Sequence, residues 1–304
     1  MKLSKIHLLF FLSSLLVIGA CANEKKQNDK PKIAYLDLLE DETLAQARQG
    51  FWDALAKNGY SEKDGSLEVI YKNANGDQMA LVQACDYMVS QNVDIIATNP
   101  TLSTITAVKK SGNIPVCMMV SPRPDLAGLA SKDGTWPSQL FGVYETLDYI
   151  DSSLALAMTL QPEIKKIGLI YNQSEPQSVD AFNEVKNYCA KRGIGLEALP
   201  VNASSETQQV SSVLLSKSID AFFALPDNVI FASFETVKKL CDEKKIPIYT
   251  SEAGLVKRGA KASFGADFYQ WGYQAGLQAA DYLKDKSKLP APQPVKYRIK
   301  TIGK

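Results

Sequence analysis

Short polar side chains follow five predicted strands of this sequence, where they could bind a small polar solute. Ligands of open parallel sheets bind beyond the carboxyl ends of the strands, so these loops are the first candidates for chemistry. They are Asp37–Thr43, Thr98–Thr101, Asn172–Glu175, Pro226–Asn228 and Ser251–Gly254. Each loop also fits an ordinary helix N-cap, which uses the same residue types. Five such loops in two halves of the chain favour a polar cleft between two lobes.

Two of these loops offer opposite charges to a ligand. Ser174 opens a predicted helix, with Pro176 in its first turn and Gln177 three residues on, as in a capping box. Free N–H groups at such a helix start attract a carboxylate. Asp227, anionic at neutral pH, is a candidate for binding an ammonium group. The two together suit a zwitterion such as an amino acid, although plain capping uses the same residues.

Signals for catalysis, metals, cofactors or nucleic acid are weak or absent. The single histidine, His7, lies in the leader, and the motifs G-x-S-x-G, G-x-G-x-x-G and Walker A do not occur. Carboxylates such as Glu175 and Glu252 leave an acid–base enzyme as a less favoured alternative. A net charge of +1 gives no reason to expect a nucleic-acid partner.

Short apolar runs alternate with amphipathic segments from Lys32 onward. The predicted strands are Ile33–Asp37, Leu67–Tyr71, Asp94–Ala97, Val116–Val120, Leu140–Val143, Ile167–Tyr171, Leu196–Pro200, Ala221–Leu225, Pro247–Thr250, Ser263–Asp267 and Val295–Ile299. Helices are predicted to start near Gln177, Glu206 and Asn228, with a last one over Tyr269–Leu283. This order predicts an α/β protein with two Rossmann-like lobes, each a parallel sheet covered by helices.

The tail of the chain is predicted to pass between the two lobes and to form a multi-crossing hinge. We expect lobe 1 to comprise residues 32–143 with 252–285, and lobe 2 residues 144–251 with 286–304. The ligand cleft would then lie between the lobes, and the hinge would let them close on a ligand.

The first 31 residues are not expected to belong to the fold. Residues 1–20 have a basic start and a short apolar run, which is typical of a signal peptide and too short to span a bilayer. Ile18–Cys21 resembles a bacterial lipobox, whose cysteine carries the lipid anchor; a plain signal peptide is the alternative. Residues 21–31 would then be the lipidated cysteine and a flexible polar tether.

Four further cysteines are Cys85, Cys117, Cys189 and Cys241. None is close to another in sequence, and each lies in an apolar or helical pattern. Metal binding is therefore not expected, and buried free thiols are the default, although spacing alone leaves disulfide pairing open.

Several stretches resemble the TrpX-like lipoprotein substrate-binding components of bacterial ABC importers. These stretches are Gln46–Phe51, Tyr71–Asp77, Tyr171–Glu175, Leu225–Asn228, Val256–Ala260 and Gly265–Tyr269 with Gly272, Ala275 and Gly276. The resemblance covers about Lys32 to Lys288. It implies a periplasmic-binding-protein type I fold that closes on a ligand and delivers it to an ABC permease and its ATPase.

The resemblance also implies roles for individual residues. A small-molecule ligand, expected to be an amino acid and possibly an aromatic one, would place its carboxylate at Ser174, Gln177 and Ser178 and its amino group at Asp227. The other expected ligand contacts are Asn99, Thr101, Tyr144, Asn228 and Glu252. The protein would be a monomer in the cell envelope, lipid-anchored to a bacterial membrane through Cys21 and facing the periplasm or exterior. A ligand sensor that signals to a membrane partner without transport is the alternative.

Overall fold

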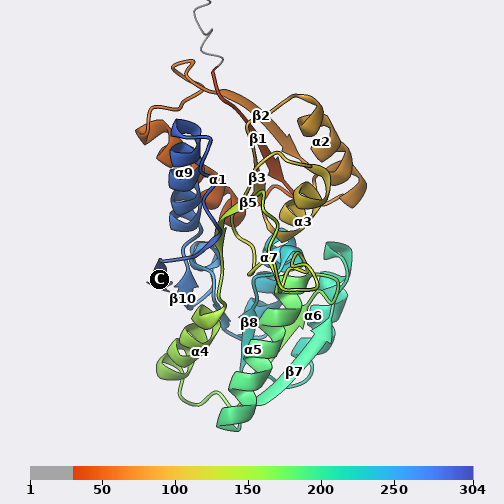
Figure 1. Ribbon diagram of the computed structural model, residues 1–304. Coiled ribbons are helices and arrows are strands. Elements are labelled where there is room, and N and C mark those ends of the chain that lie inside the picture. The colour runs from red at the N-terminus through yellow and green to blue at the C-terminus, as the bar shows by residue number, and fades with distance from the viewer. Residues whose placement is uncertain (1–29, 304) are drawn as a thin grey trace, which may run out of the picture. The chain divides into compact units, whose positions relative to one another are not determined.

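The computed structural model describes residues 30–303, which form two six-stranded sheets with helices around each (Figure 1). The predicted leader, Cys21 and most of the tether lie outside the described residues. Within residues 30–303, no helix is long and apolar enough to cross a membrane.

The first sheet is parallel throughout, and β1 is the strand next to one of its edges. Its strands, in spatial order, are β11 (Gln293–Pro294), β5 (Leu140–Tyr144), β4 (Val116–Met118), β3 (Ile95–Asn99), β1 (Lys32–Asp37) and β2 (Glu68–Asn73). Residues 33–37 of β1 are all buried. A parallel strand that is covered on both faces needs such a continuous apolar run, and this is why the sequence pattern predicts it.

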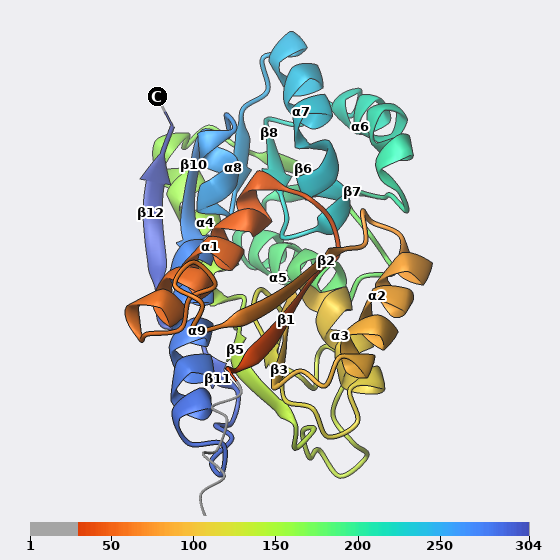
Figure 2. The ribbon, with the colours of Figure 1, turned by 90° about the horizontal axis from the view of Figure 1, so that it is seen from above.

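The second sheet has the same layout, with one antiparallel strand at its edge. Its strands, in spatial order, are β12 (Arg298–Ile302), β10 (Ala262–Ala266), β9 (Ile248–Thr250), β8 (Ala221–Ala224), β6 (Lys166–Tyr171) and β7 (Gly195–Pro200). Only β12 runs antiparallel to its neighbour, and Figure 2 shows it beside β10.

Helices cover both sheets. Those of the first sheet are α1 (Glu42–Lys57), α2 (Gln78–Ser90), α3 (Thr101–Lys110) and α9 (Phe268–Lys284). Those of the second are α4 (Asp148–Leu160), α5 (Pro176–Arg192), α6 (Thr207–Leu215) after the 3₁₀ turn η1 (Ser204–Glu206), α7 (Asn228–Glu243) and α8 (Ala253–Lys257). The predicted starts near Gln177, Glu206 and Asn228 and the last predicted helix are confirmed within a residue or so.

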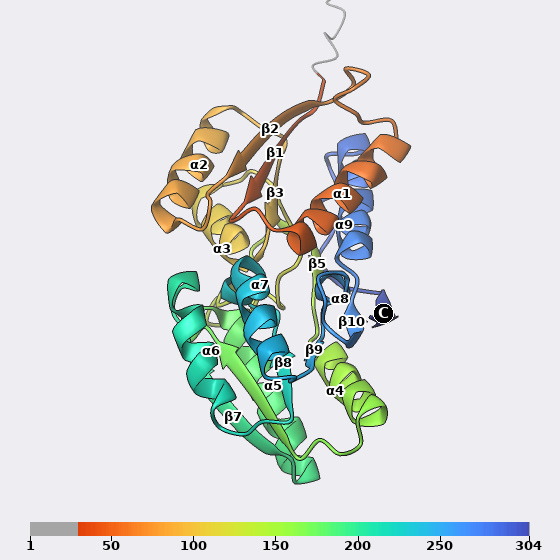
Figure 3. The ribbon, with the colours of Figure 1, turned by 180° about the vertical axis from the view of Figure 1, so that it is seen from behind.

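Helices α1 and α9 pack closely along one side of the first sheet (Figure 3). Three glycines, Gly50, Gly272 and Gly276, permit this approach. An added Cβ atom would lie 1.8 Å from the Ala47 carbonyl oxygen at Gly272, and 2.0 Å from the Tyr269 carbonyl oxygen at Gly50. At Gly276 it would lie 2.5 Å from the Phe51 carbonyl oxygen. A residue larger than glycine at these positions would force the helices apart.

The chain passes between the sheets after β5, after β10 and after β11. The positions of two strands differ from the predicted lobe ranges. The range 252–285 includes β10, which pairs with β9 and β12 in the second sheet. Conversely, β11 lies in the first sheet although residues 286–304 are predicted for the second lobe. The two lobes as separate domains stay a prediction.

Ten of the predicted strands are confirmed to within two residues at either end, but the last is not. The prediction Val295–Ile299 is wrong because the Val295 N–H still donates to the Tyr144 carbonyl of the first sheet, at 2.9 Å. Strand β12 therefore starts only at Arg298, after the crossing. The four cysteines within residues 30–303 are free and buried, as the default reading expects.

Candidate functional site

A pocket of about 450 Å³ lies between the carboxyl ends of the two sheets. Its lining comes from loops after β1, β2, β6, β7 and β8 and from the starts of α2, α3 and α7. The lining residues are Leu38, Leu39, Glu40, Asn75, Gly76, Gln78, Leu102, Asn172, Glu175, Asn202, Ala203, Ser204, Asn228, Val229 and Ala232. The strand-end loops that the sequence singles out after β1, β6 and β8 thus meet in one place, and Asn228, a predicted ligand contact, is among the lining residues.

Glu175 is the buried carboxylate in this lining. Its Oε2 accepts hydrogen bonds from the Asn228 N–H at 3.2 Å and from Asn228 Nδ2 at 2.9 Å, and its Oε1 accepts from Asn172 Nδ2 at 3.2 Å. Burial, with the nearby charge of Asp227, raises the pKa of Glu175 to about 8. The sequence analysis includes Glu175 in the candidate loop Asn172–Glu175 and as a possible acid–base group, but it does not name Glu175 as a ligand contact.

Asp227 ties the β8–α7 loop to the β6–α5 loop. Its Oδ1 accepts from the N–H groups of Val229 at 2.8 Å and Ile230 at 3.1 Å, which makes it the N-cap of α7. Its Oδ2 accepts from the Asn172 N–H at 2.7 Å and from the Ser178 hydroxyl. The side chain is fully buried. The amino-group role of Asp227 stays a prediction, and it requires a ligand to displace one of these donors.

The predicted carboxylate site at α5 is only partly assembled. Ser174 is exposed and does not cap the helix, because its N–H donates to Asn172 Oδ1 at 2.9 Å and the turn places Glu175 at the N-cap position. The capping-box prediction is therefore wrong. Gln177 is buried, and its Oε1 has no hydrogen-bond partner among the described residues. Ser178 is buried against Asp227.

The first sheet contributes Asn99 and Thr101. Asn99 is the last residue of β3, and its Nδ2 donates to Asp37 Oδ1 at 3.0 Å and to the Leu44 carbonyl at 3.1 Å. Thr101 begins α3, whose N-cap residue, Pro100, makes no side-chain cap hydrogen bond. Thr101 Oγ1 is buried without a partner among the described residues. The α3 N-terminus therefore presents free N–H groups and a free hydroxyl.

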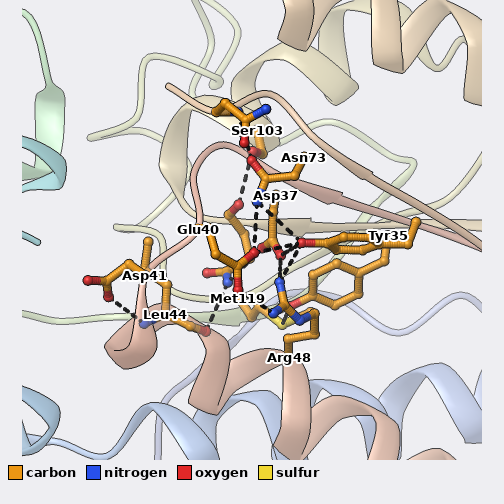
Figure 4. A network of polar contacts seen from close by, with 12 residues as sticks. Tyr35, Asp37, Glu40, Asp41, Leu44, Arg48, Asn73, Ser103 and Met119 are labelled. Atoms are coloured by element: carbon orange, nitrogen blue, oxygen red, sulfur yellow. Dashed lines mark hydrogen bonds and ion pairs between the residues drawn. The ribbon is translucent and has the colours of Figure 1, made fainter. Parts of the chain in front are cut away.

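An ionic network that the sequence did not predict holds the end of β1 (Figure 4). The Arg48 guanidinium pairs with Asp37 and, at 3.0 Å, with Glu40 of the pocket lining. It also lies 4.9 Å from the centre of the Tyr71 ring. Burial raises the pKa of Asp37 to about 6, and Arg48 opposes that rise. This network fixes the loop that carries Glu40.

Tyr144 and Glu252 complete the predicted set. Tyr144 is half-buried, and its ring meets Trp136 edge-on with the ring centres 5.5 Å apart. Glu252 is fully buried directly after β9; its Oε1 accepts from the Ser251 hydroxyl at 2.8 Å, while its Oε2 has no partner among the described residues.

Comparisons with known proteins agree with this architecture. A model of the family of ABC transporter substrate binding proteins matches residues 32–301. A tyrosine-binding protein of Clostridioides difficile strain R20291 is 34% identical over 269 residues, which are 88% of this chain and 77% of that protein.

Two solved structures are similar over 90% of this chain and 92% of theirs. One is an ABC domain from Streptococcus pneumonia in complex with L-Trp, with 26% identity and a TM-score of 0.82. The other is the ligand-free, open structure of a substrate binding protein with adhesive properties from Clostridium difficile, with 28% identity and a TM-score of 0.65. The predicted periplasmic-binding-protein type I fold is confirmed by these likenesses, and the chain belongs to the family of ABC transporter substrate-binding proteins.

Proposed function

We propose that this protein captures an amino acid, with an aromatic one favoured, by closing its two lobes around it. The observation that carries this proposal is a set of buried polar atoms that have no hydrogen-bond partner among residues 30–303 and belong to residues in or near the loops that follow strands of both sheets. The set comprises Thr101 Oγ1, Ser121 Oγ, Gln177 Oε1, Asp180 Oδ2 and Glu252 Oε2. Buried polar groups are costly unless they are hydrogen-bonded, so a polar ligand that both lobes enclose would remove that cost.

The likeness to known structures supports lobe closure. The structure is more similar to the complex with L-Trp than to the ligand-free, open protein, although its sequence identity to the latter is slightly higher. Closure would bring the orphan atoms of the two sheets together around the ligand, and contacts from both lobes would stabilise the closed state.

Two helix starts compete for the ligand carboxylate. The N-terminus of α5 has the Glu175 carboxyl group at its N-cap, which repels an anion whenever it is ionised. The N-terminus of α3 has no acidic cap and offers Thr101 with its free hydroxyl. We therefore place the ligand carboxylate at the N-terminus of α3.

Tyr144 and the adjacent Trp136 supply the aromatic surface of the proposal. Their edge-on pair lies at the end of β5, next to the first crossing, and an aromatic side chain of the ligand would extend the same packing. The relatives named for tyrosine and crystallised with L-Trp are consistent with such a ligand.

The proposal includes the setting in which capture happens. Cys21 would hold the protein on the outer side of a bacterial membrane as a lipoprotein, and the residues from Ala22 to Pro31 would tether the folded part. The loaded protein would then deliver its ligand to an ABC permease driven by its ATPase.

A thermal-shift screen of residues 30–304 against the amino acids tests the binding proposal. A true ligand stabilises the protein by an amount that grows with its concentration over Kd, so L-tyrosine or L-tryptophan should raise Tm in a dose-dependent way. Thr101→Val should weaken that ligand, while Thr159→Val on the exposed part of α4 serves as the matched control. A screen in which no amino acid changes Tm at millimolar concentration contradicts the proposal.

A further inference from the structure

A pocket of about 520 Å³ lies between α1 and β2, the strand at one edge of the first sheet (Figure 3). Its walls include Arg48 and Trp52 on α1 and Val69 and Tyr71 on β2, and we call it the outer pocket. Small-molecule sites in proteins have volumes of about 300–1,000 Å³, so the outer pocket is large enough for such a ligand. It shares one lining residue, Glu40, with the pocket between the two sheets and is otherwise separate from it.

The sequence builds the outer pocket from one face of α1 and the segment that follows this helix. Trp52 and Ala56 are one turn apart on α1, so they lie on the same face, and the small Ala56 side chain leaves space beside the indole ring. The segment that joins α1 to β2 contributes Tyr60 and Leu67. The Leu67 N–H donates to the Ser61 carbonyl at 3.1 Å and closes that segment into a loop. The outer pocket is therefore formed by elements adjacent in the chain.

Three aromatic side chains, Trp52, Tyr60 and Tyr71, line the outer pocket. The Trp52 ring packs on the buried ring of Tyr35, with the ring centres 5.4 Å apart. The Arg48 guanidinium lies 4.9 Å from the centre of the Tyr71 ring, so one wall already stabilises a cation. The faces of aromatic rings attract cations, and aromatic rings also pack against one another. These walls suit a ligand that carries an aromatic ring and a positive charge.

Arg48, one of the two cations in the lining, is already paired. Its guanidinium contacts Asp37, which is buried outside the lining, and Glu40 at 3.0 Å (Figure 4). The Tyr71 hydroxyl donates to Asp37 Oδ2 at 3.0 Å and joins the same network. Because two carboxylates share one guanidinium, the network carries one net negative charge and does not attract an anion.

The remaining charged groups of the lining add a second negative charge. Asp53 accepts hydrogen bonds from two neutral donors, Gln49 Nε2 at 2.7 Å and the Tyr269 hydroxyl at 2.9 Å, and neither donor compensates its charge. Glu62 and Lys63 are exposed neighbours on the segment after α1, and their charges offset each other. A pocket lined by an excess of one sign of charge attracts the opposite sign. The outer pocket therefore favours a cation.

We propose that the outer pocket binds an aromatic amine that carries no carboxylate. The ring of the amine lies against Trp52 and Tyr60, and its ammonium group pairs with Asp53. An amino acid fits this pocket less well, because its carboxylate would meet the negative charges of Glu40 and Asp53. The proposal assigns a second class of ligand to the protein, and it does not depend on the capture of an amino acid between the sheets.

Fluorine NMR of the protein labelled with 5-fluorotryptophan tests this site. The sequence contains three tryptophans, of which Trp52 lines the outer pocket and Trp136 and Trp271 do not. Tyramine at pH 7.5 should shift the Trp52 signal with a Kd of about 1 mM or tighter. Tyrosol, which has a hydroxyl in place of the ammonium group, should bind at least about threefold more weakly. The anion 3-(4-hydroxyphenyl)propionate should leave the Trp52 signal unchanged.

Matched variants locate the binding site of tyramine. Ala56 lines the outer pocket and Ala232 lines the pocket between the sheets, and both are exposed on helices. Ala56→Leu fills the outer pocket and should weaken tyramine binding at least about tenfold. Ala232→Leu should leave the affinity for tyramine within about twofold, because its added atoms lie in the other pocket. Asp53→Asn should weaken tyramine by about two- to fivefold and leave tyrosol unchanged, a difference that a merely structural role of Asp53 would not produce.

The proposal is overturned if tyramine at about 10 mM leaves the Trp52 signal in place, or if tyrosol or the anion binds as tightly as tyramine. Unchanged affinity for tyramine in both Ala56→Leu and Asp53→Asn overturns it as well. Loss of tyramine binding in Ala232→Leu would place tyramine between the sheets and have the same effect. Failure of every amino acid to bind, together with a tyramine-dependent shift of the Trp52 signal, would instead refute amino-acid capture and support the outer pocket.

Discussion

Replacement of Asp227 by alanine separates a structural role from a ligand-binding role. The carboxylate caps α7 through two N–H groups and also accepts from the Asn172 N–H and the Ser178 hydroxyl, all of them buried. Loss of an N-cap costs about 1 kcal/mol. Each buried donor left unpaired adds about 1–3 kcal/mol. Since burial of the carboxyl group itself is unfavourable, we expect a net loss of about 3–5 kcal/mol in the free energy of unfolding.

Urea unfolding of the ligand-free protein measures this loss. With a slope of about 3 kcal/mol per molar urea, the midpoint should fall by somewhat more than about 1 M. The matched control is Asp77→Ala, because Asp77 caps α2 with a single bond to the Ala80 N–H at 2.7 Å and is exposed. That variant should lose only about 1 kcal/mol. The reasoning is refuted if Asp227→Ala is no less stable than Asp77→Ala and its affinity for an amino acid falls more than tenfold.

Three further variants test the packing of α9 on α1, the ion pair between Arg258 and Asp41, and the buried carboxyl group of Glu145. Gly272→Ala places a methyl group 1.8 Å from a backbone oxygen of α1, so the free energy of unfolding should fall by at least about 2 kcal/mol. Gly195 has more space around it, and Gly195→Ala should lower the free energy of unfolding by less than about 1 kcal/mol in the same urea assay. Arg258→Ala removes the cation that pairs at 2.5 Å with Asp41, the buried N-cap residue of α1. The free energy of unfolding should fall by about 1–3 kcal/mol, and a second substitution, Asp41→Asn, should restore part of it. Glu145→Gln should raise the Tm of the ligand-free protein at pH 8 and leave it unchanged at pH 4. Burial raises the pKa of Glu145 to about 7, so this carboxyl group stabilises the fold below its ordinary pKa and loses that contribution as pH rises to about 7. Equal gains in Tm at both pH values would contradict this.

The strands were predictable because burial on both faces of a sheet requires a short continuous run of apolar residues. An interior parallel strand such as Ile33–Asp37 is covered on both faces, so nearly every residue must be apolar, and so short a run fits a strand better than a helix. Helix α4 lacks a comparable sequence signal at its start. It starts after Leu147, which has a φ of 60° and offers no side-chain cap, so the usual start signal is missing.

The candidate site was predictable in place but not in detail. Strand ends meet at one edge of a parallel sheet, and this rule located the loops that carry Asn228 and Glu175. Which residue of a loop faces the ligand depends on individual hydrogen bonds. The turn closed by Asn172 moves the α5 N-cap from Ser174 to Glu175, and the partners of Asp227 lie 49 and 55 residues earlier in the chain. No local pattern contains that information.

The close packing of α9 on α1 has a consequence for the order in which the protein is made. The first sheet takes β1 from residues that begin at Lys32 but its covering helix α9 from Phe268–Lys284. The start of the chain must therefore wait for residues more than two hundred positions later. Until they arrive, the apolar face of α1 around Phe51 is uncovered. If the leader directs export, this delay keeps the early part of the chain unfolded during passage through a translocation channel. It also exposes that part to proteases and chaperones on the far side, whereas most of the second sheet comes from one uninterrupted stretch, residues 166–266, and can form first.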